Sequence, residues 1–147
     1  MSRIRRILFA SDFSAASRPP FASALELARA LKAEILLVHV VVPTVPADAM
    51  YAPYVDWTTL EKASREAAQA ELDRLATQVS RRGIRVATLL ASGHAADQIV
   101  RIAKAKKAGL VVIGTHGRTG LSRFVMGSVA MRVMSGASCP VVTVRSK

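Results

Sequence analysis

Short apolar runs rich in β-branched residues alternate with longer amphipathic stretches, and this rhythm constrains the fold more than any other feature. Residues 4–10, 34–42, 84–90, 110–114 and 141–144 have the composition of strands, and residues 19–31, 58–82, 95–107 and about 128–135 carry apolar side chains at helical spacing. Nearly continuous apolar strands are typical of a parallel sheet covered on both faces. The sequence therefore predicts a parallel sheet of five strands with four helices, joined by right-handed crossovers.

The length of 147 residues suits one domain with a hydrophobic core, and a hydrophobic content of 51% excludes a largely disordered chain. We expect a single domain over residues 1–147 with a Rossmann-like α/β sandwich, strand order 3-2-1-4-5 and helices on both faces. No apolar run approaches the roughly 20 residues that cross a bilayer, and the N-terminus lacks the apolar region of a signal peptide. We therefore expect a cytoplasmic protein that does not associate with membranes.

The formal net charge of +11 comes from 21 lysines and arginines against 10 acidic residues. A large positive field attracts polyanions, so a nucleic-acid or membrane-surface binder is one interpretation. The basic residues are spread along the chain, however, whereas dedicated binders usually concentrate them on one stripe with aromatic residues between. We favour a solvated basic surface with non-specific polyanion binding.

The second helix is predicted from a capping motif and an apolar face, and a long loop with aromatic residues precedes it. Thr58 and Glu61 have capping-box spacing, so the helix is predicted to begin at Thr58. Its buried face is predicted to consist of Leu60, Ala67, Leu72, Leu75 and Val79. The preceding long loop carries Tyr51, Tyr54 and Trp57, which either pack within the loop or form a lid over a ligand.

A glycine-rich segment joins the fourth strand to the last helix, with glycines at positions 114, 117, 120 and 127. Glycine lets backbone amides approach a ligand, and a helix beginning near Gly127 and Ser128 directs amide hydrogens and a positive dipole end at it. The Ser128 hydroxyl either caps this helix or donates to a phosphate oxygen, and Arg118 and Arg123 add positive charge. The segment predicts an anion site; the alternative is that its glycines only make tight turns.

Two common nucleotide motifs are absent from the sequence. No Gly-Lys pair occurs, which excludes a P-loop, and the first strand runs into Ser11 and Asp12 without the glycines of a dinucleotide fingerprint. In the expected strand order, Asp12 and the glycine-rich segment face one cleft. Asp12 is then either a hydrogen-bond acceptor for ribose hydroxyls or a metal partner through water, or it simply forms an Asx-turn or helix cap.

The spacing Gly114-x2-Gly117-x9-Gly127-Ser128, followed by Val129 and Ala130, closely resembles the nucleotide-binding signature of the universal stress protein family. The resemblance also covers Asp12, residues 37–40 and the closing residues 139–144, so it spans essentially the whole chain. It implies a sandwich of the adenine nucleotide alpha hydrolase type. It further implies that Asp12 and Gly114 contact a ribose and that the Val40 backbone recognises an adenine edge. The resemblance places the phosphates on Gly117, Gly127, Ser128 and Val129. The residues that complete the implied site are His116, Ala130, Ala10 and Ser11.

The resemblance implies ATP as the ligand, with Mg²⁺ or Mn²⁺ held mainly by its phosphates. It also implies a homodimer through the last strand, and the β-branched run Val141 to Val144 suits an edge strand paired across a two-fold axis. The strong basicity departs from the nearly neutral or acidic composition expected of the family, which leaves room for a polyanionic partner.

His116 is the one candidate general acid or base in the glycine-rich segment, and no second histidine or carboxylate is anchored there. We therefore expect a nucleotide-responsive stress-response regulator with at most slow ATP hydrolysis or autophosphorylation. A basic nucleic-acid-binding module on the same fold is the main alternative, and a flavin- or adenylate-handling relative is a third. His39, His94 and Cys139 are expected to have structural roles.

Overall fold

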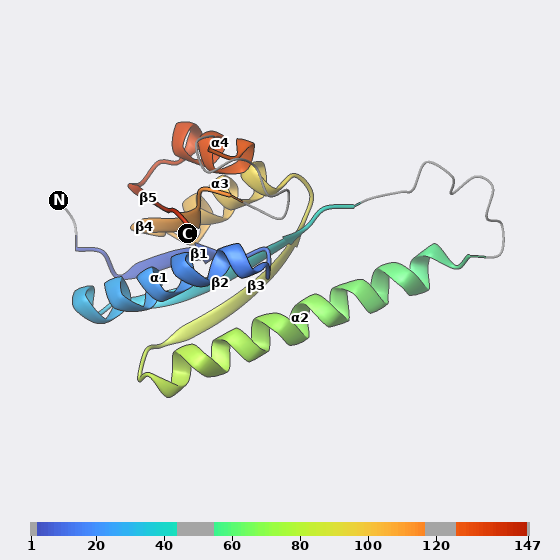
Figure 1. The fold of residues 1–147 in the computed structure, drawn as a ribbon, viewed down its shortest axis with the longest axis horizontal. Coiled ribbons are helices and arrows are strands. Elements are labelled where there is room, and N and C mark those ends of the chain that lie inside the picture. Colours follow the sequence, from blue (N-terminus) through green and yellow to red (C-terminus); the bar gives the residue numbers. More distant parts are fainter. Residues whose placement is uncertain (1–2, 44–54, 117–125, 147) are drawn as a thin grey trace.

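The computed structural model describes residues 3–43, 55–116 and 126–146 (Figure 1). Strands and helices alternate along this chain as the sequence pattern predicts. The elements are β1 (Arg6–Ala10), the 3-10 helix η1 (Ala15–Ser17), α1 (Arg18–Leu31), β2 (Glu34–Val41), α2 (Trp57–Arg81), β3 (Val86–Ser92), α3 (Ala95–Ala105), β4 (Leu110–Gly114), α4 (Ser128–Gly136) and β5 (Val141–Val144).

The five strands form one parallel sheet in the order β3-β2-β1-β4-β5, which confirms the predicted topology. β1 lies at the centre, with Leu8 opposite Leu36 of β2 on one side and opposite Val111 of β4 on the other. The chain proceeds outward from β1 in one direction through β3 and then returns to add β4 and β5. The strand order therefore reverses between β1 and β4, and their carboxyl ends lie side by side at this switch point.

Helices cover both faces of the sheet, as expected. Ile7, Phe9, Ile35 and Leu37 belong to the core cluster that contains the buried residues of α1 and α2. The alternate strand residues, Leu8, Leu36, Val38 and Val111 among them, belong to the cluster that contains those of α3 and α4. Successive strand side chains point to opposite faces, and the nearly continuous burial of β1, β2 and β4 follows from having two cores.

The third strand begins two residues later than its composition predicts and ends at Ser92. Ile84 is buried at the end of α2, where its amide donates to the Val79 carbonyl, so it closes the helix. Pairing with β2 then places Val86 opposite Ile35. The register of the neighbouring strand, which local composition does not encode, sets these bounds.

The structure corrects the start of α2. Trp57 is its first residue, and the N-cap is Asp56 rather than Thr58. Asp56 Oδ1 accepts a hydrogen bond from the Thr59 amide at 3.2 Å, and Oδ2 accepts one from the Thr59 hydroxyl at 2.6 Å. These bonds, the hydroxyl bond foremost, hold the pKa of Asp56 below its ordinary value of 3.8. The predicted lid residues Tyr51 and Tyr54 lie outside the described residues.

The buried face of α2 is shorter than predicted. Leu72, Leu75 and Val79 are buried, but Ala67 is exposed and Leu60 is 52% exposed. The N-terminal half of α2 extends beyond the strands, as Figure 1 shows, so its apolar positions have no sheet to pack against. Within the described residues, no helix is long and apolar enough to span a membrane.

We expect Asp56→Ala to accelerate hydrogen exchange of the first-turn amides of α2 by about fivefold at neutral pH, because the cap bond to the Thr59 amide is lost. A carboxylate with a lowered pKa stabilises the fold above its unfolded pKa, and that contribution disappears as the pH falls through the folded pKa. The difference between wild type and variant should therefore vanish in strong acid. Thr58→Ala is the matched control, and an equal effect of that variant would restore the capping-box assignment.

Candidate functional site

A cavity of about 310 Å³ opens at the switch point, between the carboxyl ends of β1, β2 and β4 and the N-terminal turns of α3 and α4. Residues far apart in sequence meet here because parallel strands all end at one edge of the sheet. The cavity brings together the predicted residues Ala10, Ser11, Asp12, Val40, Gly114, His116, Gly127, Ser128, Val129 and Ala130. The predicted phosphate contact Gly117, with Arg118 and Arg123, lies outside the described residues.

The N-terminus of α4 forms one wall of this cavity. Gly127 is the N-cap in an extended conformation, and the Met131 amide makes the first turn's bond to the Gly127 carbonyl at 3.1 Å. An α-helix offers no intrahelical acceptor to its first amides, which here belong to Ser128, Val129 and Ala130. All three residues line the cavity. These amides and the positive end of the helix dipole create a site for an anion.

Ser128 is the first residue of α4 and Gly127 occupies the N-cap, so the suggested capping role of Ser128 is wrong. A capping hydroxyl must come from the residue before the helix, where its oxygen reaches the amides two or three positions on. Of the two roles considered for the Ser128 hydroxyl, contact with a bound anion is the one left as a prediction.

Gly127 is held against the end of β4. Its amide donates to the Thr115 carbonyl at 2.6 Å, and a Cβ at this position would lie 3.0 Å from the same oxygen. Thr115 is buried, and its own amide donates to the Val144 carbonyl of β5 at 3.0 Å. Thr115 therefore connects the anion site to the last strand. Sequence analysis missed this residue, although its position directly after Gly114 in the glycine-rich segment is a usable signal.

Gly114 has a packing reason to be glycine. A Cβ there would lie 3.1 Å from Cγ of Pro20 in α1 and 3.5 Å from the His116 carbonyl oxygen. The missing side chain lets the first turn of α1 approach the end of β4. Gly114 therefore borders the cavity through its backbone, and its conformation needs no positive φ.

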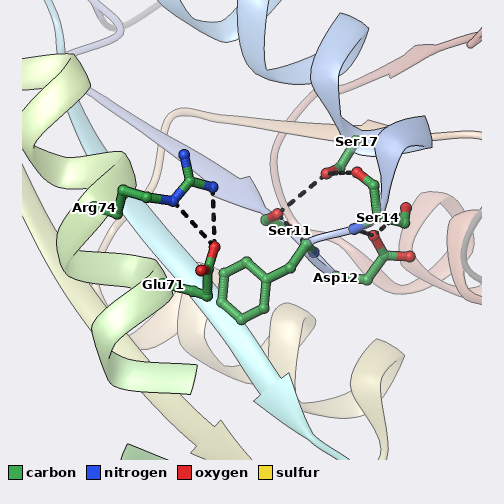
Figure 2. A network of polar contacts seen from close by, with 7 residues as sticks. Ser11, Asp12, Ser14, Ser17, Glu71 and Arg74 are labelled. Carbon is green, nitrogen blue, oxygen red and sulfur yellow. Dashed lines mark hydrogen bonds and ion pairs between the residues drawn. The ribbon is translucent and has the colours of Figure 1, made fainter. Parts of the chain in front are cut away.

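The turn after β1 is held by a network of serines around Asp12 (Figure 2). Asp12 Oδ1 accepts hydrogen bonds from the Ser14 amide at 2.9 Å and from the Ser14 hydroxyl at 2.6 Å. The buried Ser11 accepts a bond from the Phe13 amide at 3.1 Å and donates to the Ser17 hydroxyl at 3.3 Å. Asp12 thus forms the Asx-turn considered as its structural role, while still lining the cavity. The turn fixes the position of the carboxyl group at the cavity wall.

Figure 2 also shows Glu71 and Arg74, which face each other on α2. Their ion pair measures 2.9 Å and has helical i,i+3 spacing. Both residues lie outside the set that lines the cavity. The pair is a surface contact of α2, and pairs of this kind contribute little to stability.

His39 is a cavity residue that sequence analysis assigned only a structural role. Its Nδ1 lies 2.7 Å from the Ser11 carbonyl oxygen, and its ring stacks on Phe13 with centroids 4.1 Å apart. A carbonyl only accepts, so Nδ1 carries the hydrogen in this bond. Phe13 adopts a φ of 64°, which brings its ring over His39. The histidine therefore both fixes the turn after β1 and borders the cavity, and its place one residue before Val40 is the sequence signal.

His116 lines the cavity, whereas Cys139 lies outside it. The His116 Nδ1 lies 2.9 Å from the Thr115 hydroxyl, beside the helix terminus. In the described part of the chain, no three histidine, cysteine or acidic residues are grouped to hold a metal ion. Cys139 packs against the core on the α3 and α4 side, where burial raises the pKa of its thiol and keeps it protonated.

A doubly wound parallel sheet with a helix N-terminus and a cavity at its switch point defines an α/β protein of Rossmann-like architecture. The sequence model of the universal stress protein family matches residues 3–145. The chain belongs to the universal stress protein family.

Individual relatives agree with this assignment. The chain is 32% identical over 145 residues to the universal stress protein MJ0531 of Methanocaldococcus jannaschii. This alignment covers 96% of this chain and 82% of that protein. The crystal structure of a family protein from Burkholderia pseudomallei superimposes with a TM-score of 0.79 at 30% identity, over 99% of both chains. The Archaeoglobus fulgidus universal stress protein in complex with dAMP gives a TM-score of 0.66 at 24% identity, over 97% of this chain and 98% of that one.

Proposed function

We propose that this protein binds adenine nucleotides, ATP in particular, in the switch-point cavity and acts as a nucleotide-responsive regulator of the stress response. The observation that carries the proposal is the N-terminus of α4, whose first amides border a cavity at the carboxyl edge of the sheet. The dAMP complex of the Archaeoglobus fulgidus relative supports an adenine nucleotide as the ligand.

Each part of the nucleotide has a suitable partner. The amides of Ser128, Val129 and Ala130 suit the phosphates, because backbone N–H groups at a helix N-terminus bind anions without competing side chains. The Asp12 carboxyl suits a ribose hydroxyl, and the turn around it keeps the group in place. The backbone at Val40 suits an adenine edge at the carboxyl end of β2. The cavity volume of about 310 Å³ lies at the lower end of the range for small-molecule pockets.

The cleft favours binding over turnover. Asp12 is the only carboxylate among the described residues that line the cavity, so Mg²⁺ or Mn²⁺ would be held chiefly by the phosphates. Phosphoryl transfer also needs a positioned nucleophile and a base, and among the described residues His116 is the histidine that lies beside the N-terminus of α4. Hydrolysis, if present, is expected to be slow.

A chain of backbone hydrogen bonds runs from α4 to β5 and supports the proposed regulatory role. A ligand that contacts α4 acts on Gly127, whose amide bonds to Thr115, and Thr115 in turn bonds to Val144. β5 is the edge strand next to β4. We propose that it pairs with β5 of a second copy to form a homodimer. Nucleotide binding would then bias the geometry of the subunit interface.

The first test is to denature the purified protein and identify any nucleotide that accompanies it, then to titrate the emptied protein with ATP and AMP. We expect micromolar or tighter ATP binding that changes little between low and high salt, because oriented amides supply most of the contacts. The absence of nucleotide binding at both salt concentrations would reject the proposal.

A further inference from the structure

The basic residues that appear scattered in the sequence gather at the amino edge of the sheet, opposite the cavity. Every helix of the described chain ends, and every strand begins, at that edge, so its cations come from the connecting segments together with the helix ends and the first residue of β1. Just over half of the 21 lysines and arginines lie in these loops and the adjoining helix ends: Arg3, Arg5, Arg6, Arg29, Lys32, Arg81, Arg82, Arg85, Lys104, Lys106 and Lys107.

Backbone bonds place these cations in one row across neighbouring strands. The Arg5 carbonyl accepts from the Glu34 amide, and the Arg85 carbonyl accepts from the Ile35 amide, both at 2.9 Å. The Arg6 guanidinium donates to the Lys106 carbonyl at 2.6 Å. The row thus follows β3, β2, β1 and β4, and at strand spacing it is about 15 Å long.

The charge of this edge is almost unopposed. Glu34 is the one acidic residue in the same loops, and it is already paired with Arg6 at 2.5 Å. Apart from Arg6, every cation of the row is exposed. Four helices end here, but each helix terminus carries only about half a negative charge. Helix dipoles therefore account for a small part of this concentration of cations.

The surroundings of the row indicate what kind of polyanion it fits. Among the described residues, the exposed large hydrophobic side chains lie outside the segments that form the row: Val129, Met131 and Met134 are on α4, and Val42, Val55, Trp57 and Leu60 lie toward the carboxyl end of the sheet. A membrane-binding surface normally adds apolar side chains that enter the bilayer, and a single-strand binder adds aromatic side chains for base stacking. The amino edge offers neither, and its arginines suit the bidentate recognition of phosphates.

We propose that the amino edge of the sheet is a sequence-independent binding surface for the phosphate backbone of double-stranded nucleic acid. A row of about 15 Å spans several phosphates of each strand of a duplex, because each strand carries one phosphate for roughly every 3.4 Å along the helix axis. The surface is separate from the nucleotide cavity, so one molecule can hold both ligands.

The test measures fluorescence anisotropy of a labelled 20-base-pair DNA duplex of arbitrary sequence between 50 and 300 mM salt. Arg5→Gln, Arg85→Gln and Lys106→Gln are combined in one variant, since these residues lie in the segments that precede β1, β3 and β4 and only their backbones make structural bonds. Lys62→Gln, Arg65→Gln and Arg101→Gln form the matched control, which removes the same charge from α2 and α3. Thermal unfolding and ATP titration of each variant establish that fold and cavity are intact.

We expect the wild-type affinity to fall steeply with salt and the edge variant to bind at least about tenfold more weakly, with a salt slope smaller by roughly two to three. The control should stay within about threefold of wild type. No duplex binding at 50 mM salt, or equal losses in both variants, would overturn the proposal. Binding to phosphatidylserine vesicles without binding to the duplex would overturn it as well, in favour of a membrane surface.

Discussion

Gly127→Val is expected to weaken ATP binding by about a hundredfold or more. A Cβ at this position meets the Thr115 carbonyl oxygen at 3.0 Å, so a branched side chain must displace the first turn of α4 from the end of β4. That displacement moves the amides of Ser128 and Val129 away from the phosphates. Hydrogen bonds to charged groups contribute about 1.5 to 3 kcal/mol each, so misplacing two of them accounts for the loss. Isothermal titration calorimetry of the nucleotide-free protein measures the effect.

Gly127→Ala provides a graded version of the same experiment. Its single methyl group requires a smaller shift, so we expect an intermediate affinity. Ser135→Val is the control, because Ser135 is exposed on the C-terminal half of α4 and far from the helix N-terminus. Thermal unfolding separates misfolding from loss of the site. A folded Gly127→Val protein with wild-type affinity would refute the assignment of the phosphates to this helix.

Thr143→Pro is expected to prevent formation of the proposed homodimer. The carbonyls of Pro140 and Val144 accept bonds from β4, so the backbone groups of Thr143, which alternate with them, face the free edge of β5. Proline removes an edge amide and blocks strand pairing, but it is tolerated where that amide does not pair within the sheet. Light scattering after gel filtration gives the mass, and Thr143→Val is the control that keeps the amide.

The two variants distinguish dimerisation through β5 from dimerisation through another surface. A monomeric proline variant beside a dimeric valine variant supports pairing through β5. Two dimeric variants would place the interface elsewhere, and the exposed Met131 and Met134 of α4 would then be the next surface to change. We expect ATP to raise the stability of the proposed dimer, because the Thr115 bonds connect the cavity to β5.

Local patterns are sufficient for much of this fold. Apolar runs and helical spacing predict all five strands and all four helices, because burial on two faces imposes them residue by residue. The spacing of Gly114, Gly127 and Ser128 also predicts which loops meet at the switch point, since parallel strands deliver their carboxyl ends to one edge. Local signals failed at Leu60 because they do not show whether a sheet lies beside that part of α2. They failed at Asp56 because two candidate caps, Asp56 and Thr58, stand close together in the sequence.

Tertiary structure alone decides which distant residues become neighbours. Thr115 acquires its role by bonding to both Gly127 and Val144, and His39 by bonding to Ser11, none of which a local pattern encodes. The charge distribution is the clearest case. About half of the cations, although spread along the chain, meet in one row, because right-handed crossovers return every helix to the same edge of a parallel sheet. Sequence determines how many charges the protein carries, whereas long-range strand pairing determines where their field is concentrated.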